Sequence, residues 1–182
     1  VSAALRYRTE HLYFWVQDGL AYEDQALAQL AETFENQIYP TNRRFFGSEW
    51  TPGIDGDPRL HILYAGGLGS NVVGYFYSVD QVHKEIAATS NEREMFYLNA
   101  DNAALDEEYT YSVLAHEFQH MIHWHQDQNE ETWLSEGFSQ LASYLNGYNP
   151  GNFEQAYIPN PDMQLNDWPV NGDAAPAYGA AY

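Results

Sequence analysis

The first half of the chain contains apolar and aromatic runs that predict β-strands separated by turns. The stretch YRTEHLYFWVQDG (7–19) has the aromatic and β-branched content of a strand and closes on an Asp18–Gly19 turn signal. Further strands are predicted in RLHILYAGG (59–67), NVVGYFYSVDQV (71–82) and REMFYLNAD (93–101). Gly74 interrupts the second of these runs. The pattern therefore predicts a sheet that leads into a helical half.

Three stretches have apolar residues at the three- and four-residue spacing of an amphipathic helix. The first runs from Tyr22 to Ile38 and is expected to end at Pro40, because proline cannot continue the helical hydrogen bonds. The second covers about 108–125, and the third covers 131–147, where Gly147 is a stop signal. From about 146 to 177 the chain is rich in Pro, Asn, Asp and Gly, which predicts a long irregular segment.

Length and charge limit the class of protein. The 182 residues are enough for one domain, 1–182, with the sheet and second helix in about 1–126 and a smaller helical and irregular lobe in about 127–182. A net charge of −19 repels phosphate backbones and anionic lipids, so nucleic acid and membranes are not expected as partners. No signal peptide is visible at Val1, so a mature form is expected.

Histidines are concentrated in HEFQHMIHWH (116–125), which holds four of the seven in the chain. Because the chain has no cysteine, any metal must be held by His, Asp or Glu. His116, Glu117 and His120 form the pattern H-E-x-x-H, which places both imidazoles on one helix face within reach of one zinc ion. Glu117 lies one residue further round the helix, where it can act as general base on a zinc-bound water. The alternative is a helix with surface or hydrogen-bonded core histidines.

The third zinc ligand is predicted on the next helix. His123 is a tempting choice, but over seven residues a helix rises about 10.5 Å, whereas ligand atoms around one tetrahedral zinc lie only ~3.4 Å apart. We therefore expect His123 beside the site or at its rim. A metzincin pattern fails too, since its Gly and third His positions hold His123 and Gln126. Glu136, opposite the apolar side of its helix, is the better candidate, and the alternative for it is a solvated surface acid.

These motifs resemble a known family. HEFQH followed by WLSEGFS is similar to the gluzincin metallopeptidases, and the stretch from 97 to 148 is similar to secreted bacterial peptidases of the immune inhibitor A-like and hyicolysin-like type. The resemblance implies zinc bound by His116, His120 and Glu136, with Glu117 as base, in an extracellular bacterial protein. It implies a zincin-like α+β fold, in which a small mixed or antiparallel sheet packs on the active-site helix and a second helix carries the third ligand.

The chain departs from the family pattern in two places. Thermolysin-like gluzincins have an acid four residues after the third ligand that steadies a zinc histidine, and here Gln140 holds that position. The closing APAYGAAY (175–182) resembles the start of a helix that such families continue, so a C-terminal truncation is expected. Since gluzincins use a His or Tyr to stabilise the oxyanion, Tyr178 is the candidate for that role, against a core or lid tyrosine.

The sequence favours a zinc-dependent endopeptidase that attacks peptide bonds with a zinc-activated water. A peptide or protein substrate would add as a strand along an edge formed by REMFYLNAD or VVGYFYS, and the acidic field favours basic or neutral substrates. Calcium is a second candidate ion, since GIDGDP (53–58) and NADNAALDEE (99–108) cluster oxygen ligands, although turn chemistry explains both. The alternatives are a zinc hydrolase with a non-peptide substrate, or a non-catalytic metal-, carbohydrate- or protein-binding module with an aromatic platform of Tyr75, Tyr77 and Trp168.

Overall fold

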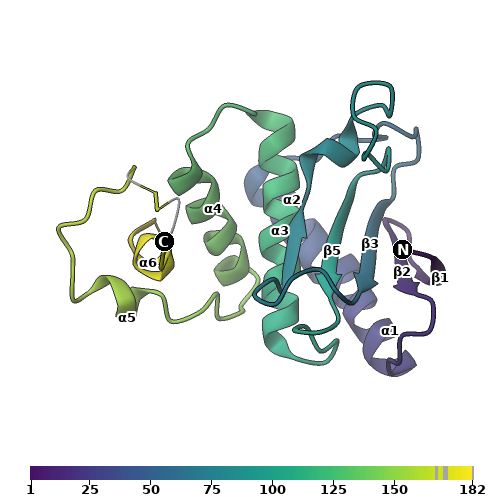
Figure 1. Cartoon of the computed structure of the whole chain (residues 1–182), viewed down its shortest axis with the longest axis horizontal. Coiled ribbons are helices and arrows are strands. Elements are labelled where there is room, and N and C mark those ends of the chain that lie inside the picture. The colour runs from purple at the N-terminus through teal and green to yellow at the C-terminus, as the bar shows by residue number, and fades with distance from the viewer. Residues whose placement is uncertain (167, 170–171, 182) are drawn as a thin grey trace.

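A five-stranded mixed sheet forms the N-terminal part of the molecule (Figure 1). The computed structural model describes residues 1–166, 168–169 and 172–181. The strands are β1 (Ala3–Arg8), β2 (Leu12–Gln17), β3 (Leu60–Ala65), β4 (Gly74–Phe76) and β5 (Met95–Asn99). Their order across the sheet is β1-β2-β3-β5-β4, with β2, β3 and β5 parallel and both outer strands antiparallel to their neighbours. The expectation of an α+β fold with a small mixed sheet is confirmed.

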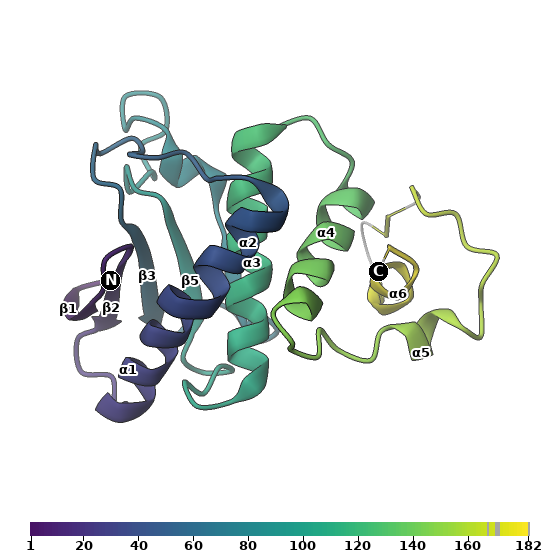
Figure 2. The same cartoon turned by 180° about the vertical axis from the view of Figure 1, so that it is seen from behind.

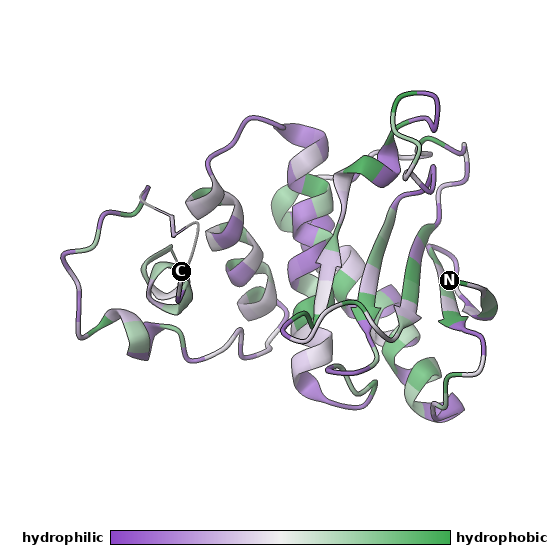
Figure 3. Cartoon of the chain, in the orientation of Figure 1, coloured by the Kyte–Doolittle hydropathy of each residue, from purple (hydrophilic) through white to green (hydrophobic). Residues whose placement is uncertain are grey.

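Helices cover one face of this sheet (Figure 2). They are α1 (Asp24–Thr33), the π-helical turn η1 (Phe34–Ile38), α2 (Tyr39–Phe46) and α3 (Glu108–Gln126). The core lies between the helices and the sheet and contains four fully buried phenylalanines, Phe14, Phe34, Phe96 and Phe118. Figure 3 shows hydrophobic residues gathered in β3 and β5, the central strands. Burial of this apolar surface holds α3 against the sheet, at about 25 cal/mol for each Å² removed from water.

Three predicted elements in the first half of the chain differ from the structure. The strand expected over 71–82 is limited to β4 and is followed by the short 3-10 helix η2 (Ser78–Gln81). The single strand expected over 7–19 contains the end of β1, a chain reversal at residues 9–11 and all of β2. The reversal was missed because it lacks the Gly, Pro or Asn that normally marks a turn. The first helix does not end at Pro40, which lies instead in the first turn of α2, where a missing N–H costs little. The preceding π-helical turn, closed by the bond from the Tyr39 N–H to the Phe34 carbonyl, widens the backbone ahead of the proline ring.

The C-terminal third is helical at both ends of an extended segment. Helix α4 (Thr132–Leu145) lies between α3 and α6 (Ala175–Ala181), and the short α5 (Glu154–Tyr157) also contacts α6 (Figures 1 and 2). The prediction of an irregular segment over 146–177 therefore missed α5 and the start of α6. Among the described residues, no helix has both the length and the apolar content needed to cross a bilayer.

The loop over 53–58 is held by protein groups rather than arranged around an ion. The Ile54 N–H donates to Glu94 Oε1 at 3.0 Å, and Asp55 pairs with the guanidinium of Arg93 at 2.9 Å. Asp57 accepts a hydrogen bond from the Tyr13 hydroxyl at 2.9 Å. The carboxylates of this loop already have partners in the chain itself.

The second stretch proposed for calcium, 99–108, is likewise organised by turns. Asp101 accepts the Gly67 N–H at 2.8 Å and Asn99 donates to the carbonyls of Gly69 and Val72. Within the described residues, neither stretch contributes to a group of three closely spaced carboxylate or histidine ligands. The structure gives the calcium expectation no support, because turn and loop hydrogen bonds account for these side chains.

Glu94 gives the fold a testable pH dependence. Burial, with the negative charge of Asp55 adding to it, raises the pKa of Glu94 to about 7 from 4.5. A carboxyl whose folded pKa is raised contributes stability below pH ~4.5, and this contribution is lost as the pH rises through about 7. We expect the free energy of unfolding, measured with urea, to fall between pH 5 and pH 8 by on the order of 2 kcal/mol more in wild type than in Glu94→Gln. Equal losses in the two proteins would refute this role for Glu94.

Candidate metal centre

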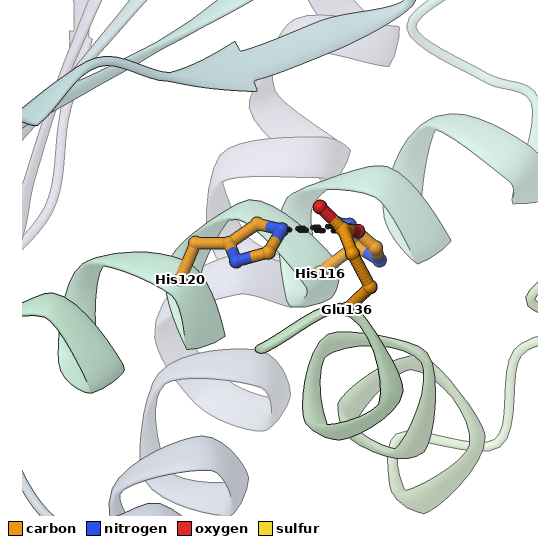
Figure 4. Close-up of side chains that lie close together, drawn as sticks. All are labelled: His116, His120 and Glu136. Carbon is orange, nitrogen blue, oxygen red and sulfur yellow. Dashed lines mark hydrogen bonds and ion pairs between the residues drawn. The ribbon is translucent and has the colours of Figure 1, made fainter. Parts of the chain in front are cut away.

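Helices α3 and α4 together position three potential zinc ligands. His116 and His120 lie one turn apart on α3, and Glu136 reaches toward them from α4 (Figure 4). The apolar residues of α3 fix which face points outward, because Leu114, Phe118 and Ile122 are fully buried in the core. The two imidazoles are thus left on the side that faces α4. His116, His120 and Glu136 are each half-buried.

The ligand atoms form a triangle of the size that one zinc ion requires. His116 Nε2 and His120 Nε2 are 3.0 Å apart, and Glu136 Oε2 lies 3.3 Å from the former and 3.5 Å from the latter. Around a tetrahedral zinc with bonds of about 2.0–2.1 Å, neighbouring ligand atoms lie ~3.4 Å apart. The structure therefore brings together the three side chains predicted as ligands. Their ligand atoms have nearly the mutual distances of three ligands around one tetrahedral zinc ion.

The polar atoms that form this triangle are suited to hold a cation. Glu136 Oε2 is buried and lies within ion-pair distance of both imidazole nitrogens, but it forms no hydrogen bond of regular geometry with them, so a cation between the three atoms would satisfy it. Burial alone would raise the pKa of Glu136, but the imidazoles of His116 and His120 hold this pKa below its usual value. The carboxylate is thus ionised, as a metal ligand must be. Two imidazoles and one carboxylate fit a zinc ion with one position left open.

Glu117 is held beside the triangle by the edge strand of the sheet. Its side chain is buried, and its Oε2 accepts the backbone N–H of Phe76 in β4 at 2.8 Å. Strand β4 can lie this close to α3 because Gly74 has no Cβ, which would meet Val113 at 2.7 Å. The carboxylate lines both cavities that open on the metal centre. It is therefore placed to exchange a proton with a group bound there.

Ser135 contacts the ring nitrogen of His120 that faces away from the triangle. The Ser135 Oγ lies 3.1 Å from His120 Nδ1. With Nε2 directed at the metal position, the Nδ1–H donates to this hydroxyl and fixes the ring orientation. Gln140, the residue expected to steady a zinc histidine, is buried and lines a cavity with His116. Within the described part of the chain, the hydrogen-bond partner of His120 Nδ1 is Ser135. The sequence analysis did not predict this residue.

Replacing Ser135 should weaken zinc binding. We expect Ser135→Ala to lower zinc affinity about 10- to 100-fold, the usual cost of losing a group that orients a ligand. Competition with a chromophoric chelator measures this affinity. Ser143→Ala is the matched control, because Ser143 lies on the same helix and donates to the Ser112 carbonyl instead. Zinc affinity unchanged by Ser135→Ala would show that His120 is oriented by another group.

The remaining histidines of the motif lie away from the triangle. His123 is half-buried at the cavity wall, its ring 5.7 Å from that of Phe138, and burial lowers its pKa. His125 is exposed. This arrangement agrees with the helical-rise argument that a single helix cannot supply three ligands.

Tyr178 is brought to the centre from the far end of the chain by α6. It lines both cavities beside His116 and Glu117. Burial, followed by the negative charge of Glu136, raises its pKa, so the phenol keeps its proton. Its ring stacks on Phe153 at 5.1 Å and meets Trp168 edge-on at 5.0 Å. These ring contacts fix the hydroxyl near the metal position.

A second group of potential ligands lies at the start of β2. Glu10, His11 and Glu35 have ligand atoms within 4.8 Å of one another. Here, however, Glu35 is already satisfied: it accepts hydrogen bonds from the Thr9 hydroxyl and the His11 backbone, and its other oxygen lies 2.6 Å from His11 Nδ1. The buried oxygen without a regular hydrogen bond that marks the first group is missing from this one.

Comparison with known proteins supports a place among the metallopeptidases. The chain is similar to the neutral metalloprotease ShpI of Staphylococcus hyicus, with 28% identity over 205 residues that cover the whole chain and 45% of that relative. The chain thus spans somewhat less than half the length of the relative it matches. No protein-family model matches it.

Proposed function

We propose that this chain is the catalytic part of a zinc-dependent endopeptidase of the gluzincin type. The observation that carries the proposal is the triangle of His116, His120 and Glu136, with its buried oxygen that forms no regular hydrogen bond and with Glu117 beside it. The similarity to a metalloprotease supports the same reaction class. When bound, zinc would supply a Lewis acid that polarises a carbonyl group and lowers the pKa of water towards 7.

Glu117 is the proposed general base. Its carboxylate accepts one backbone N–H from β4 and lines the cavities on both sides of the metal position. The Glu117 carboxylate would take a proton from the attacking water and deliver it to the leaving amine. Tyr178, whose raised pKa keeps the phenol protonated, would donate a hydrogen bond to the developing oxyanion.

The substrate is proposed to bind along β4 as an added strand. Of the two candidate edges, REMFYLNAD forms β5, which is enclosed between β3 and β4, whereas VVGYFYS contains β4 at the end of the sheet. The edge of β4 can hydrogen-bond an extended peptide and present it to Glu117. An aromatic binding platform has less support, because Tyr75 stacks on Tyr97 at 4.4 Å while Trp168 packs against Tyr178.

Within this proposal, 1–182 acts as one catalytic unit and works outside the cell. The metal centre uses residues from both parts of the chain, since α3 belongs to the sheet-bearing part while α4 and α6 belong to the C-terminal part. The extracellular location rests on the resemblance of the metal motif to secreted bacterial peptidases.

Removing zinc should abolish proteolysis reversibly. We expect the zinc-loaded chain to hydrolyse casein, and dialysis against a chelator to eliminate this activity because water and carbonyl would lose their Lewis acid. Adding back one equivalent of zinc should restore it, as measured by release of soluble peptides. Casein hydrolysis that persists in metal-free protein would rule out a metallopeptidase.

A further inference from the structure

Two cavities of different chemistry flank the candidate metal centre. One, of about 460 Å³, extends along the C-terminal half of α3 to the loop before α4, and is called here the α3–α4 cavity. The other, of about 360 Å³, extends toward residues 71–74 and the first turns of α3, and is called the β4–α6 cavity. Both are lined by Tyr75, His116, Glu117 and Tyr178. A peptide held at the metal would therefore face both cavities, one on each side of its reacting bond.

The β4–α6 cavity is mainly apolar. Val72, Val73, Val113, Pro150 and Phe153 line it, and among the residues that the structure describes Glu117 is the one acid in its lining. An apolar side chain gains about 25 cal/mol for each Å² of surface buried in such a cavity, whereas a charged one would lose its hydration.

The α3–α4 cavity is acidic. Besides Glu117 and Glu136, the lining includes Asp127 and Glu130, and no Lys or Arg is found among its described residues. The Asp127 carboxylate accepts the Asn129 N–H at 2.9 Å and the Glu130 carboxylate accepts the Glu131 N–H at 3.0 Å. These loop hydrogen bonds hold one oxygen of each carboxylate and leave the second oxygen to interact with a ligand.

The same cavity has aromatic walls. Tyr77, the residue after β4, and Trp124 of α3 line it, together with Tyr75, one face of which is covered by Tyr97. Aromatic faces bind the aliphatic stems of Lys and Arg and attract their cationic heads. Burial is the largest influence on the nearby His123 and lowers its pKa, while the charges of Glu130 and Asp127 act in the opposite direction.

We propose that the α3–α4 cavity binds a Lys or Arg side chain of the substrate next to the reacting bond, with Asp127 and Glu130 as the residues that determine this specificity. The residue on the other side of the bond would place an apolar side chain in the β4–α6 cavity. This inference rests on the proposed peptidase function and adds the class of substrate to it. The negative charge of the whole chain favours basic substrates in general. The α3–α4 cavity adds a positional preference, because it would bind Lys or Arg on only one side of the peptide bond that is cleaved.

Cleavage-site profiling tests the proposal in its first step. The zinc-loaded chain is incubated with a mixture of peptides of known sequence, and mass spectrometry identifies the bonds that are cut. We expect Lys and Arg to be enriched on one side of the cut bond and apolar residues on the other. Cleavage without enrichment of Lys or Arg would overturn the subsite and leave the peptidase intact. No cleavage of any peptide would overturn the peptidase proposal itself.

Matched substitutions assign the preference to its residues. For a peptide with Lys at the enriched position, Asp127→Asn/Glu130→Gln should lower kcat/KM about fivefold to tenfold, because two exposed carboxylates each contribute modestly. The loss should shrink as salt increases, and the matched peptide with norleucine should be unaffected. Glu85→Gln/Asp162→Asn is the control. Both residues are exposed and line neither cavity, and the double substitution removes the same number of negative charges. An equal loss in the control would assign the effect to overall charge and overturn the assignment.

Discussion

Glu117→Gln is expected to abolish peptide hydrolysis while leaving zinc binding and folding intact. Glutamine keeps the shape of the side chain and can still accept the Phe76 N–H, which Glu117 Oε2 accepts at 2.8 Å. It cannot take a proton from water at neutral pH, so kcat should fall about 10³-fold or more, toward the upper end of what general-base catalysis contributes. The measurement is kcat for a quenched fluorescent peptide, with zinc content determined on the same sample.

A second substitution on the same helix is the control for this result. Glu108→Gln removes an exposed carboxylate from the first turn of α3, far from the triangle, and should leave kcat within about twofold of wild type. If Glu117→Gln retained a substantial part of the wild-type kcat, another group would have to act as the base. If it lost its zinc, Glu117 would be a ligand rather than a proton carrier.

Glu136→Ala is expected to remove zinc from the chain. The substitution deletes the one ligand that comes from α4, leaving two imidazoles on α3 that cannot enclose the ion. Zinc affinity should fall by more than the 10- to 100-fold that the loss of an outer orienting group costs. Elemental analysis after dialysis should give about one zinc per wild-type chain and far less for the variant. Zinc-dependent protection against thermal unfolding should disappear with it.

The alternative group of ligands provides the control for zinc loss. Glu10→Ala removes an exposed carboxylate from the group of Glu10, His11 and Glu35 and should not change zinc content. Zinc that stays with Glu136→Ala but leaves Glu10→Ala would place the metal at the start of β2. Zinc that stays in both variants would direct attention to His123 and His125.

The proposed ligand set could be predicted from the sequence because most of its geometry is local. His116 and His120 share a helix face at a spacing of one turn. Glu136 follows after a short loop and was selected with help from the family resemblance, and it reaches the histidines because α4 packs against α3. Helical geometry also excluded His123, which lies at the cavity wall. Tyr178 required the family resemblance, because nothing near it in the sequence shows that α6 lies beside α4.

Other features depend on tertiary contacts that the sequence pattern does not contain. The contact between Phe76 and Glu117 exists only because β4 pairs with β5 at the sheet edge and Gly74 permits close approach to α3. Ser135 was missed although it directly precedes Glu136, since a serine on a helix has many possible partners. Pro40 gave a false end to the first helix because the π-helical turn before it leaves no mark in the hydrophobic pattern.

Anomalous diffraction at the zinc absorption edge, from crystals of the zinc-loaded chain, tests the central claim most directly. We expect one anomalous peak with bonds of about 2.0–2.2 Å to His116 Nε2, His120 Nε2 and a Glu136 carboxylate oxygen, and with the remaining position facing Glu117. A peak bonded instead to His11 and Glu35, or to His123 or His125, would contradict the assignment of the centre. No peak in protein soaked with excess zinc would contradict the zinc peptidase altogether.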